Sequence, residues 1–424
     1  MTLSSEKLAI HGGDTLYEGD WPSYFHGSEE IADEEKAAVL RVLDKKRLFR
    51  YLAKGIDDSE ASQLEAGYRD LLSRKHALAV NSGTAALIAG LVGVGVGPGD
   101  EVIVPAYTYI ATAAAVIGAH AVPVIAEIDS SLNLDPSDFE KKITPFTKAV
   151  IPVHMRGVPA RMGEILTIAR RHNLKVVEDV AQANGGMYRG KMLGSLGDVG
   201  CFSLQQYKVI TAGEGGVVVT DDNEVFQRCG MVHDSAIRFW QGEGSIDGFP
   251  GVNYRLSELS AALALAQFQK MPAILARLRA VKARVVSQIR HVPGIKLQDV
   301  PDPDGDCGIA VIFFCPSPDL AKAFSAALKA EGIPNGTMYD NTIADRHIYR
   351  NWDYVLAKRG ATAAGCPWTC GAYHGSVEYS PDMCPNSLDY LGRAVSLGLS
   401  QRMTDEHADL IAEGIRKVAG VLLD

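Results

Sequence analysis

Several features that would point to other classes of protein are missing from these 424 residues. No apolar run reaches the roughly 18 residues that a transmembrane helix needs, and the opening MTLSSEKLAIHGG lacks the apolar core of a signal peptide. The net charge is −9, and the densest basic cluster, DKKRLFR at 44–50, is too short for a nucleic-acid track. We therefore expect a cytoplasmic protein with neither a membrane nor a nucleic acid as partner.

The cysteines give no sign of a metal centre. Seven are scattered along the chain, and only Cys366 and Cys370 lie close together, so the second pair of a zinc site is missing. The stretch DPDGD at 302–306 has its glycine too early for a calcium loop and lacks the closing glutamate. No metal is expected, and the cysteines are interpreted as free thiols.

The common nucleotide-binding signatures are missing as well, since no G-x-G-x-x-G follows a strand and no G-x-x-x-x-G-K-[ST] occurs. What the chain does contain is a repeated order of apolar run, polar turn and helical stretch. HALAV (76–80), EVIVPAY (101–107) and LKVVEDV (174–180) are typical strands of this pattern. Apolar strands that alternate with helices predict a parallel sheet covered on both faces. Ligands of such sheets bind at the carboxyl ends of the strands.

A long helical pattern over 256–292, interrupted by Pro272, follows this alternating part. The chain is long enough for two globular units. We predict a large domain over residues 1–275 and a smaller C-terminal α/β domain over 276–424.

The first polar motif at a strand end is NSGTAAL, 81–87. Its glycine lets another group approach the backbone closely, and free amides at a helix start favour an anion such as phosphate. A serine or threonine that caps the helix gives the same letters. The motif alone leaves both interpretations open.

The second motif, LKVVEDVAQ, ends a strand with Glu178 and Asp179. One interpretation is an exposed strand end. The other is a buried aspartate that faces a cation, such as a protonated ring nitrogen. Gln182 lies just beyond and is a candidate contact for a ring substituent.

The third motif is CFSLQQYKVITAGEGGVVVT, 201–220, in which Lys208 sits in an apolar, strand-like stretch. Burial lowers the pKa of a lysine, and a neutral amine can attack a carbonyl to form a Schiff base. The alternative is a surface lysine whose stem lies on apolar residues. The glycines at 213–216 would let the chain turn sharply beside a bulky ligand.

Together, a phosphate cradle, a buried acid and a reactive lysine fit pyridoxal 5′-phosphate better than a nucleotide. The order NSGTAAL, PAYTYIAT, EDVAQANGG, FSLQQYK, TAGEGG and NYRLSE closely resembles the DegT/DnrJ/EryC1/StrS family of sugar aminotransferases, strongly over residues 30–275 and loosely beyond. This resemblance implies the α/β architecture of fold-type I, as in aspartate aminotransferase. Its large domain has a mainly parallel seven-stranded sheet.

The resemblance also implies roles for individual residues. Lys208 would carry pyridoxal phosphate as the internal aldimine, and Asp179 would pair with the pyridinium nitrogen, which makes these two catalytic. Gln182 would lie beside the phenolic oxygen, and Tyr109 would stack on the ring. The phosphate contacts would be Gly83, Thr84, Ser203 and, from the neighbouring subunit of a homodimer with shared active sites, Asn253.

The implied reaction moves an amino group from L-glutamate or L-glutamine to a ketone of a sugar, sugar nucleotide or cyclitol, as in antibiotic or polysaccharide biosynthesis. Asn184 and Tyr207 depart from the usual family pattern and leave the acceptor open. The start of the chain resembles cyclitol and aminohydroxybenzoate members, whereas VHMRG and LFRY resemble members that act on an eight-carbon keto acid sugar. Candidate substrate contacts are Arg50, Tyr51, His154, Arg156 and Arg402. Each arginine is otherwise a solvated or salt-bridged surface group.

Two alternatives remain at this point. Dehydratases of the same family typically replace the lysine with histidine, so Lys208 argues against them, but an aromatising dehydratase keeps it. A non-catalytic sensor that binds pyridoxal phosphate would need a DNA-binding segment or a basic face, and neither is apparent in the sequence.

Overall fold

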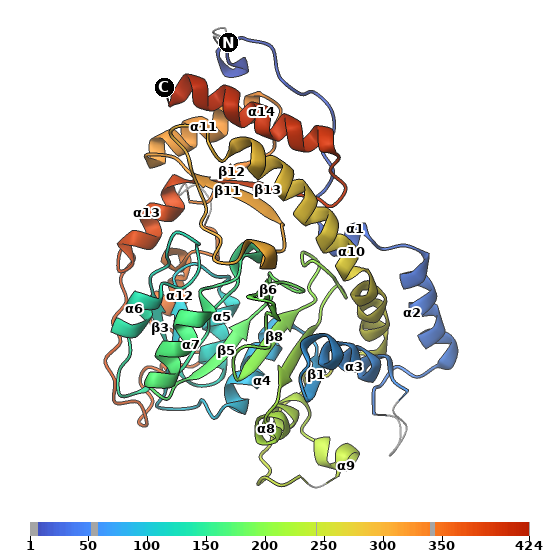
Figure 1. Cartoon of the computed structure of the whole chain (residues 1–424). Coiled ribbons are helices and arrows are strands. Elements are labelled where there is room, and N and C mark those ends of the chain that lie inside the picture. Colours follow the sequence, from blue (N-terminus) through green and yellow to red (C-terminus); the bar gives the residue numbers. More distant parts are fainter. Residues whose placement is uncertain (1–6, 52–57, 243, 340–343, 424) are drawn as a thin grey trace.

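The computed structural model describes residues 7–51, 58–242, 244–339 and 344–423. A seven-stranded sheet forms the larger lobe (Figure 1). Six of its strands run in one direction, and β9 runs antiparallel to both of its neighbours. The strand order is β1 (His76–Val80), β9 (Gly216–Thr220), β8 (Val199–Ser203), β5 (Lys175–Asp179), β4 (Thr147–Val150), β2 (Glu101–Pro105) and β3 (Val122–Ala126). The predicted, mainly parallel sheet is confirmed.

Alternating side chains of this sheet enter two separate apolar clusters. Ala77 and Ala79 of β1 pack on the face that carries helices α3 (Glu60–Leu72), α7 (Met162–Arg171) and α10 (Glu258–Ile289). Leu78 and Val80 pack on the opposite face, under α4 (Gly83–Gly93), α5 (Ala111–Gly118) and α8 (Asn223–His233). Because both faces are covered, the strands are apolar throughout, as the sequence indicates.

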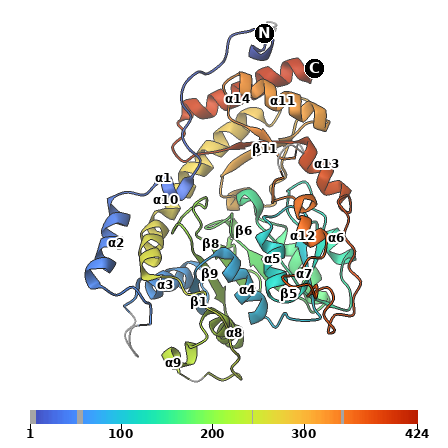
Figure 2. The same ribbon diagram turned by 180° about the vertical axis from the view of Figure 1, so that it is seen from behind.

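A smaller lobe holds a four-stranded antiparallel sheet of order β10 (Lys296–Leu297), β11 (Ala310–Phe314), β13 (Ala394–Gly398) and β12 (Gly336–Thr337). Helices α11 (Pro318–Ala330) and α14 (Asp405–Leu422) pack beside it. The first and the last of the described residues lie at this lobe (Figure 2). The amide of Ala9 donates to Glu331 Oε1 (2.9 Å), and Trp21 Nε1 donates to the carbonyl of Gly332 (2.7 Å), so the N-terminal segment packs on the C-terminal lobe.

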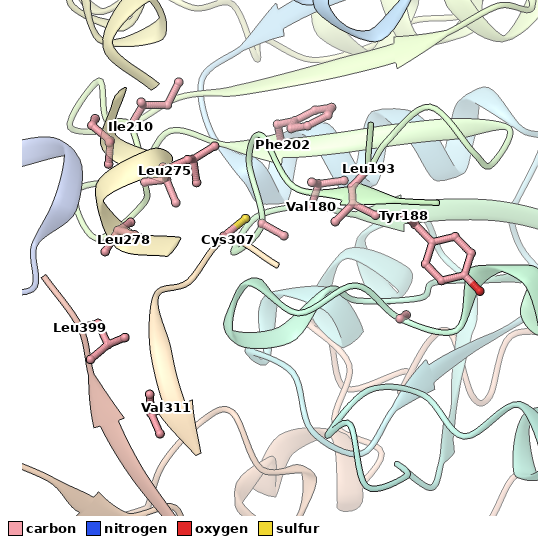
Figure 3. Close-up of a cluster of buried hydrophobic side chains, with 14 of the residues drawn as sticks. Val180, Tyr188, Leu193, Phe202, Ile210, Leu275, Leu278, Cys307, Val311 and Leu399 are labelled. Atoms are coloured by element: carbon pink, nitrogen blue, oxygen red, sulfur yellow. The ribbon is translucent and has the colours of Figure 1, made fainter. Parts of the chain in front are cut away.

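Helix α10 joins the two lobes and continues through Pro272. By length and composition alone it could also cross a bilayer, a test that core helices of soluble proteins pass too. It packs along α2 (Asp33–Lys45), α3 and α14. Figure 3 shows its Leu275 and Leu278 in one apolar cluster with Phe202 of β8 and Val311 of β11.

The predicted division at residue 275 therefore falls inside one helix, and it stays a prediction. Contacts also cross it elsewhere, because Tyr379 Oη donates to the carbonyl of Pro123 (2.6 Å) and Tyr373 Oη to Glu101 Oε1 (2.7 Å) at the large sheet. The remaining helices and strands are α1 (His26–Glu29), α6 (Pro136–Lys141), β6 (Met187–Tyr188), β7 (Lys191–Met192), α9 (Ile237–Gln241), α12 (Asp353–Leu356) and α13 (Pro385–Arg393).

Candidate active site

Lys208 lies in the loop between β8 and β9, not in a strand as its apolar neighbours suggest. A turn precedes it, in which its amide donates to the carbonyl of Gln205 (3.0 Å). Val209 and Ile210 are buried in the core as parts of this loop, which is why the stretch looks strand-like in sequence. The N-terminal segment closes over the loop, since the amide of Gly27 donates to the carbonyl of Lys208 (3.1 Å).

The amine of Lys208 is held in a partly buried, poorly solvated position. Burial lowers its pKa; the negative charges of Asp179 and Glu214 oppose this effect only in part, and the positive charge of Arg156 adds to it. Within the described residues Nζ forms neither a hydrogen bond nor an ion pair. A lysine of this kind is disposed to act as a nucleophile.

Asp179 ends β5 and is only 4% exposed, so the interpretation as an exposed strand end is wrong. Thr112 Oγ1 donates to Oδ2 (2.9 Å), and the amide of Ala181 donates to Oδ1 (3.0 Å). Burial raises the pKa of Asp179, and these hydrogen bonds and the positive charge of Lys208 offset the rise only in part. A cation beside this carboxylate would stabilise its charged form.

Glu178 is fully buried and serves a different purpose from Asp179. Its carboxylate accepts hydrogen bonds from the amides of Gly194 (2.9 Å) and Leu196 (2.7 Å), and it lies 3.2 Å from His154 Nε2. The amide of Ala160 donates to His154 Nδ1 (3.0 Å), so the ring carries its proton on Nε2 and donates to Glu178. His154, a predicted substrate contact, is thus fully buried and fully bonded, and the geometry favours a structural role for it.

The start of α4 and the end of β8 form a cradle. Ser82 caps the helix by accepting a hydrogen bond from the amide of Ala85 (3.0 Å). A Cβ atom on Gly83 would lie 2.7 Å from Cβ of Ser203, a contact too short for any other residue. The structure therefore contains both the helix cap and the close approach of the backbone that the sequence motif left open. The amides of Gly83 and Thr84 and the hydroxyl of Ser203 meet at a helix N-terminus, where an anion is favoured.

The ring-binding candidates lie on neighbouring segments. Gln182 Oε1 accepts a hydrogen bond from the amide of Arg156 (3.1 Å). Tyr109 is half-exposed, and its ring centroid lies 5.2 Å from that of His347. Asp345 Oδ1 lies 2.8 Å from Nδ1 of His347.

Sequence reasoning missed Thr112, Asp345 and His347. The chain folds residues 344–348 from the C-terminal part against 107–110, where the amide of Thr108 donates to the carbonyl of His347 (2.9 Å). No local sequence motif predicts the pairing of these two segments. A sequence signal for Thr112 did exist, because it lies in the same PAYTYIAT stretch as Tyr109.

The other predicted contacts are not joined to Lys208 by any direct contact within the described residues. Arg50 forms a buried ion pair with Glu65 (Nη2 to Oε2, 2.8 Å), and Tyr51 Oη lies 3.0 Å from His233 Nε2. Arg402 pairs with Glu29 (2.9 Å) at the surface. Asn253 is exposed and accepts a hydrogen bond from the amide of Arg255 (3.2 Å). Their roles stay predictions.

A mainly parallel seven-stranded sheet with a smaller antiparallel lobe defines the class of fold-type I transferases. Residues 29–367 match the model of the DegT/DnrJ/EryC1/StrS aminotransferase family. The chain belongs to this family.

Named relatives support the assignment. The chain is 32% identical over 397 residues to the spore coat polysaccharide biosynthesis protein SpsC of Bacillus subtilis, which covers 92% of this chain and 95% of that one. It is 40% identical over 280 residues to dTDP-3-amino-3,4,6-trideoxy-alpha-D-glucose transaminase of Streptomyces venezuelae (66% and 71%). The match to GDP-perosamine synthase of Caulobacter vibrioides, 44% over 216 residues, spans about half of each chain (49% and 56%).

Solved structures agree in fold. The 3-amino-5-hydroxybenzoic acid synthase superimposes with a TM-score of 0.75 at 27% identity, covering 96% of this chain and all of that one. DesV of S. venezuelae, solved with a ketimine intermediate, gives a TM-score of 0.73 at 31% identity (92% and 95%). The predicted family, fold class and aminotransferase class are confirmed.

Proposed function

We propose that this protein moves an amino group from L-glutamate or L-glutamine to a ketone of a sugar, sugar nucleotide or cyclitol, with pyridoxal phosphate as its cofactor. The observation that carries the proposal is the placement of a partly buried Lys208, in the loop after β8, next to the buried carboxylate of Asp179, which ends the neighbouring strand β5. Membership of an aminotransferase family and the sugar-related names of the relatives support it. We place the enzyme in the cytoplasm.

The residues present fit this cofactor in three respects. Lys208 offers an amine of lowered pKa for its aldehyde carbon, and Asp179 offers a buried carboxylate for its ring nitrogen. The helix start at Gly83 approaches Ser203 so closely that a Cβ atom would fill the space, which suits a phosphate held by amides. Gln182, Tyr109 and Thr84 would complete the set in this subunit, and Asn253 would enter from a second subunit.

Pyridoxal phosphate, when bound, withdraws electrons from the substrate carbon that carries nitrogen. Asp179 would keep a proton on the ring nitrogen, because its charged form is otherwise penalised by burial. Thr112 and Ala181 fix both carboxylate oxygens, so the acid cannot turn away. Lys208 Nζ would take the proton from the substrate carbon and return it, since a lowered pKa makes the neutral amine, which acts as the base, more available.

The test is reductive trapping. The purified protein, loaded with pyridoxal phosphate and treated with borohydride, should carry the cofactor on the peptide that contains Lys208, and Lys208→Ala should fold but trap none. L-glutamate or L-glutamine should bleach the cofactor's absorbance in the wild type. Trapping at a different lysine would refute the assignment of Lys208. Stable binding of the cofactor without bleaching by either amino acid would refute transamination and favour a sensor.

A further inference from the structure

Arg156 adopts a backbone conformation that non-glycine residues avoid. Its φ is 53° and its ψ is 30°, in the left-handed region, within a short turn between His154 and Gly157. Seven other non-glycine residues of the described chain also have positive φ, among them Lys46 and Ser73 at helix C-caps, where it is common. Strained residues of this kind persist where the surroundings hold them, and they gather at ligand sites.

Two contacts hold Arg156 in place. Its amide donates to Gln182 Oε1 (3.1 Å), and its Nε donates to Oη of the fully buried Tyr107 (3.1 Å). The first contact fixes the backbone at Arg156, and the second fixes the guanidinium through its Nε atom. The planar group therefore presents its two terminal nitrogens in one orientation.

The two terminal nitrogens of Arg156 are open. Among the residues that the structure describes, neither Nη atom has a hydrogen-bond acceptor, and no carboxylate lies within 4.0 Å of the group. Arg50 differs from Arg156 in this respect, because both of its terminal nitrogens donate to the carboxylate of Glu65. An arginine that is held at Nε and open at both Nη atoms is arranged for a planar anion, which it binds through two parallel hydrogen bonds.

The two terminal nitrogens of Arg156 lie at the active site. Arg156 comes two residues after His154, whose amide donates to the carbonyl of Asp179 (3.1 Å), the acid that ends β5. Gln182, which holds its backbone, is itself a candidate cofactor contact. An anion bound by the fork would thus stand beside the substrate carbon.

We propose that the guanidinium of Arg156 binds a carboxylate of a substrate in this site. The inference rests on the proposed transaminase function. The amino-acid donor is the favoured source, because every donor carries an α-carboxylate whereas a sugar acceptor need not. A carboxylate on the acceptor is the other source, and the experiment below separates the two.

The test compares wild type with Arg156→Gln and Arg156→Lys, each loaded with cofactor and checked by melting temperature. Calorimetric titration with glutarate, which has carboxylates but no amino group to transfer, measures binding without turnover. Bleaching by L-glutamine, whose only carboxylate is the α-carboxylate, measures the donor. D-glucuronate and D-glucose, titrated by calorimetry, represent acidic and neutral acceptors.

Arg156→Gln should raise the half-saturating concentrations of glutarate and L-glutamine about 10- to 100-fold, with D-glucose unchanged. Arg156→Lys should lose less affinity for both compounds, because it keeps the positive charge but not the two parallel donors of the guanidinium. Arg189→Gln is the matched control, since Arg189 is also an arginine of positive φ (50°) but is exposed.

If Arg156→Gln weakens the binding of D-glucuronate only, the carboxylate that Arg156 binds belongs to the acceptor, and the proposal still holds. Unchanged binding of glutarate, L-glutamine and D-glucuronate in a folded Arg156→Gln protein would overturn it. If wild type binds glutarate but no amino acid bleaches its cofactor, the transaminase proposal fails, and the glutarate titration still decides whether Arg156 binds carboxylates.

Discussion

Gly83 and Ser203 approach each other so closely that a Cβ atom on the glycine would lie 2.7 Å from Cβ of the serine. This contact brings the first turn of α4 against the end of β8. Neither residue is near the other in sequence. Their juxtaposition places helix amides and a hydroxyl at the point where three sequence motifs converge.

Gly83→Ala should therefore weaken the binding of pyridoxal phosphate at least about 10-fold, because either α4 or β8 must shift to make room and the amides leave their position. Fluorescence or absorbance titration of the cofactor-free protein measures the affinity. Gly97→Ala is the control, because a Cβ atom there meets no atom within 4 Å. Equal affinity in the two variants would show that the close approach does not shape the phosphate site.

Asp179→Asn should reduce turnover at least about 100-fold while the cofactor still binds, because an amide cannot hold the ring nitrogen's proton. Single-turnover bleaching by L-glutamate or L-glutamine measures the rate. A rate near that of wild type would reject the role of Asp179.

The same substitution should stabilise the cofactor-free protein near neutral pH. Burial raises the pKa of Asp179 in the folded chain, so its charged form penalises folding above that pKa, and the penalty disappears as the pH falls to the ordinary value of about 3.9. Melting temperatures of wild type and Asp179→Asn should differ at pH 7 and converge toward pH 4. A variant less stable than wild type at pH 7 would contradict the raised pKa.

The stability contributed by the pair of His154 and Glu178 has the opposite dependence on pH. Burial alone would raise the pKa of Glu178, but hydrogen bonds from His154 and from backbone amides outweigh it, and the pKa is lowered. Its contribution to stability is present above the ordinary glutamate value of about 4.3 and is lost as the pH falls through the lowered folded value.

His154→Ala should cost about 3 kcal/mol of unfolding free energy at pH 7, since it removes one donor from the buried carboxylate of Glu178, opens a buried space and leaves the amide of Ala160 without a partner. Chemical denaturation measures this cost. His172→Ala, which removes a surface histidine paired with Glu140, should leave stability unchanged. A stable His154→Ala protein with weakened substrate binding would restore His154 as a substrate contact.

The sequence was sufficient to predict residues at strand ends, but it did not predict partners that are distant in the chain. Asp179 ends a strand, and Lys208 and the helix start at Gly83 follow strands within a few residues, so apolar runs and motif order were enough to predict that they lie at one sheet edge. The partner of Arg50 was not predictable, because Glu65 lies one helix away and any surface acid would fit the pattern equally well. His347 reaches Tyr109 only through a pairing across more than 200 residues, which no periodicity encodes.

The position of Asn253 suits active sites that are shared between two subunits. Asn253 is exposed at the surface, although an ion pair between the partly buried Arg255 and the buried Asp234 (2.8 Å) fixes the segment around it. A polar side chain that is fixed yet directed to the surface suits a contact with a second copy of the chain. In the proposed homodimer, Asn253 of one subunit would reach the phosphate held by Gly83 of the other.

Co-expression of Lys208→Ala and Asn253→Ala subunits tests this arrangement at limiting cofactor, where neither homodimer is active. In a mixed dimer with shared sites, one site carries both lesions and the other carries neither. Half of the dimers are mixed and half of their sites are intact, so turnover should recover to about a quarter of wild type. If Asn253 served its own subunit, each site of the mixed dimer would carry one lesion and no activity would return. Recovery therefore requires that the asparagine and the lysine of one working site come from different chains.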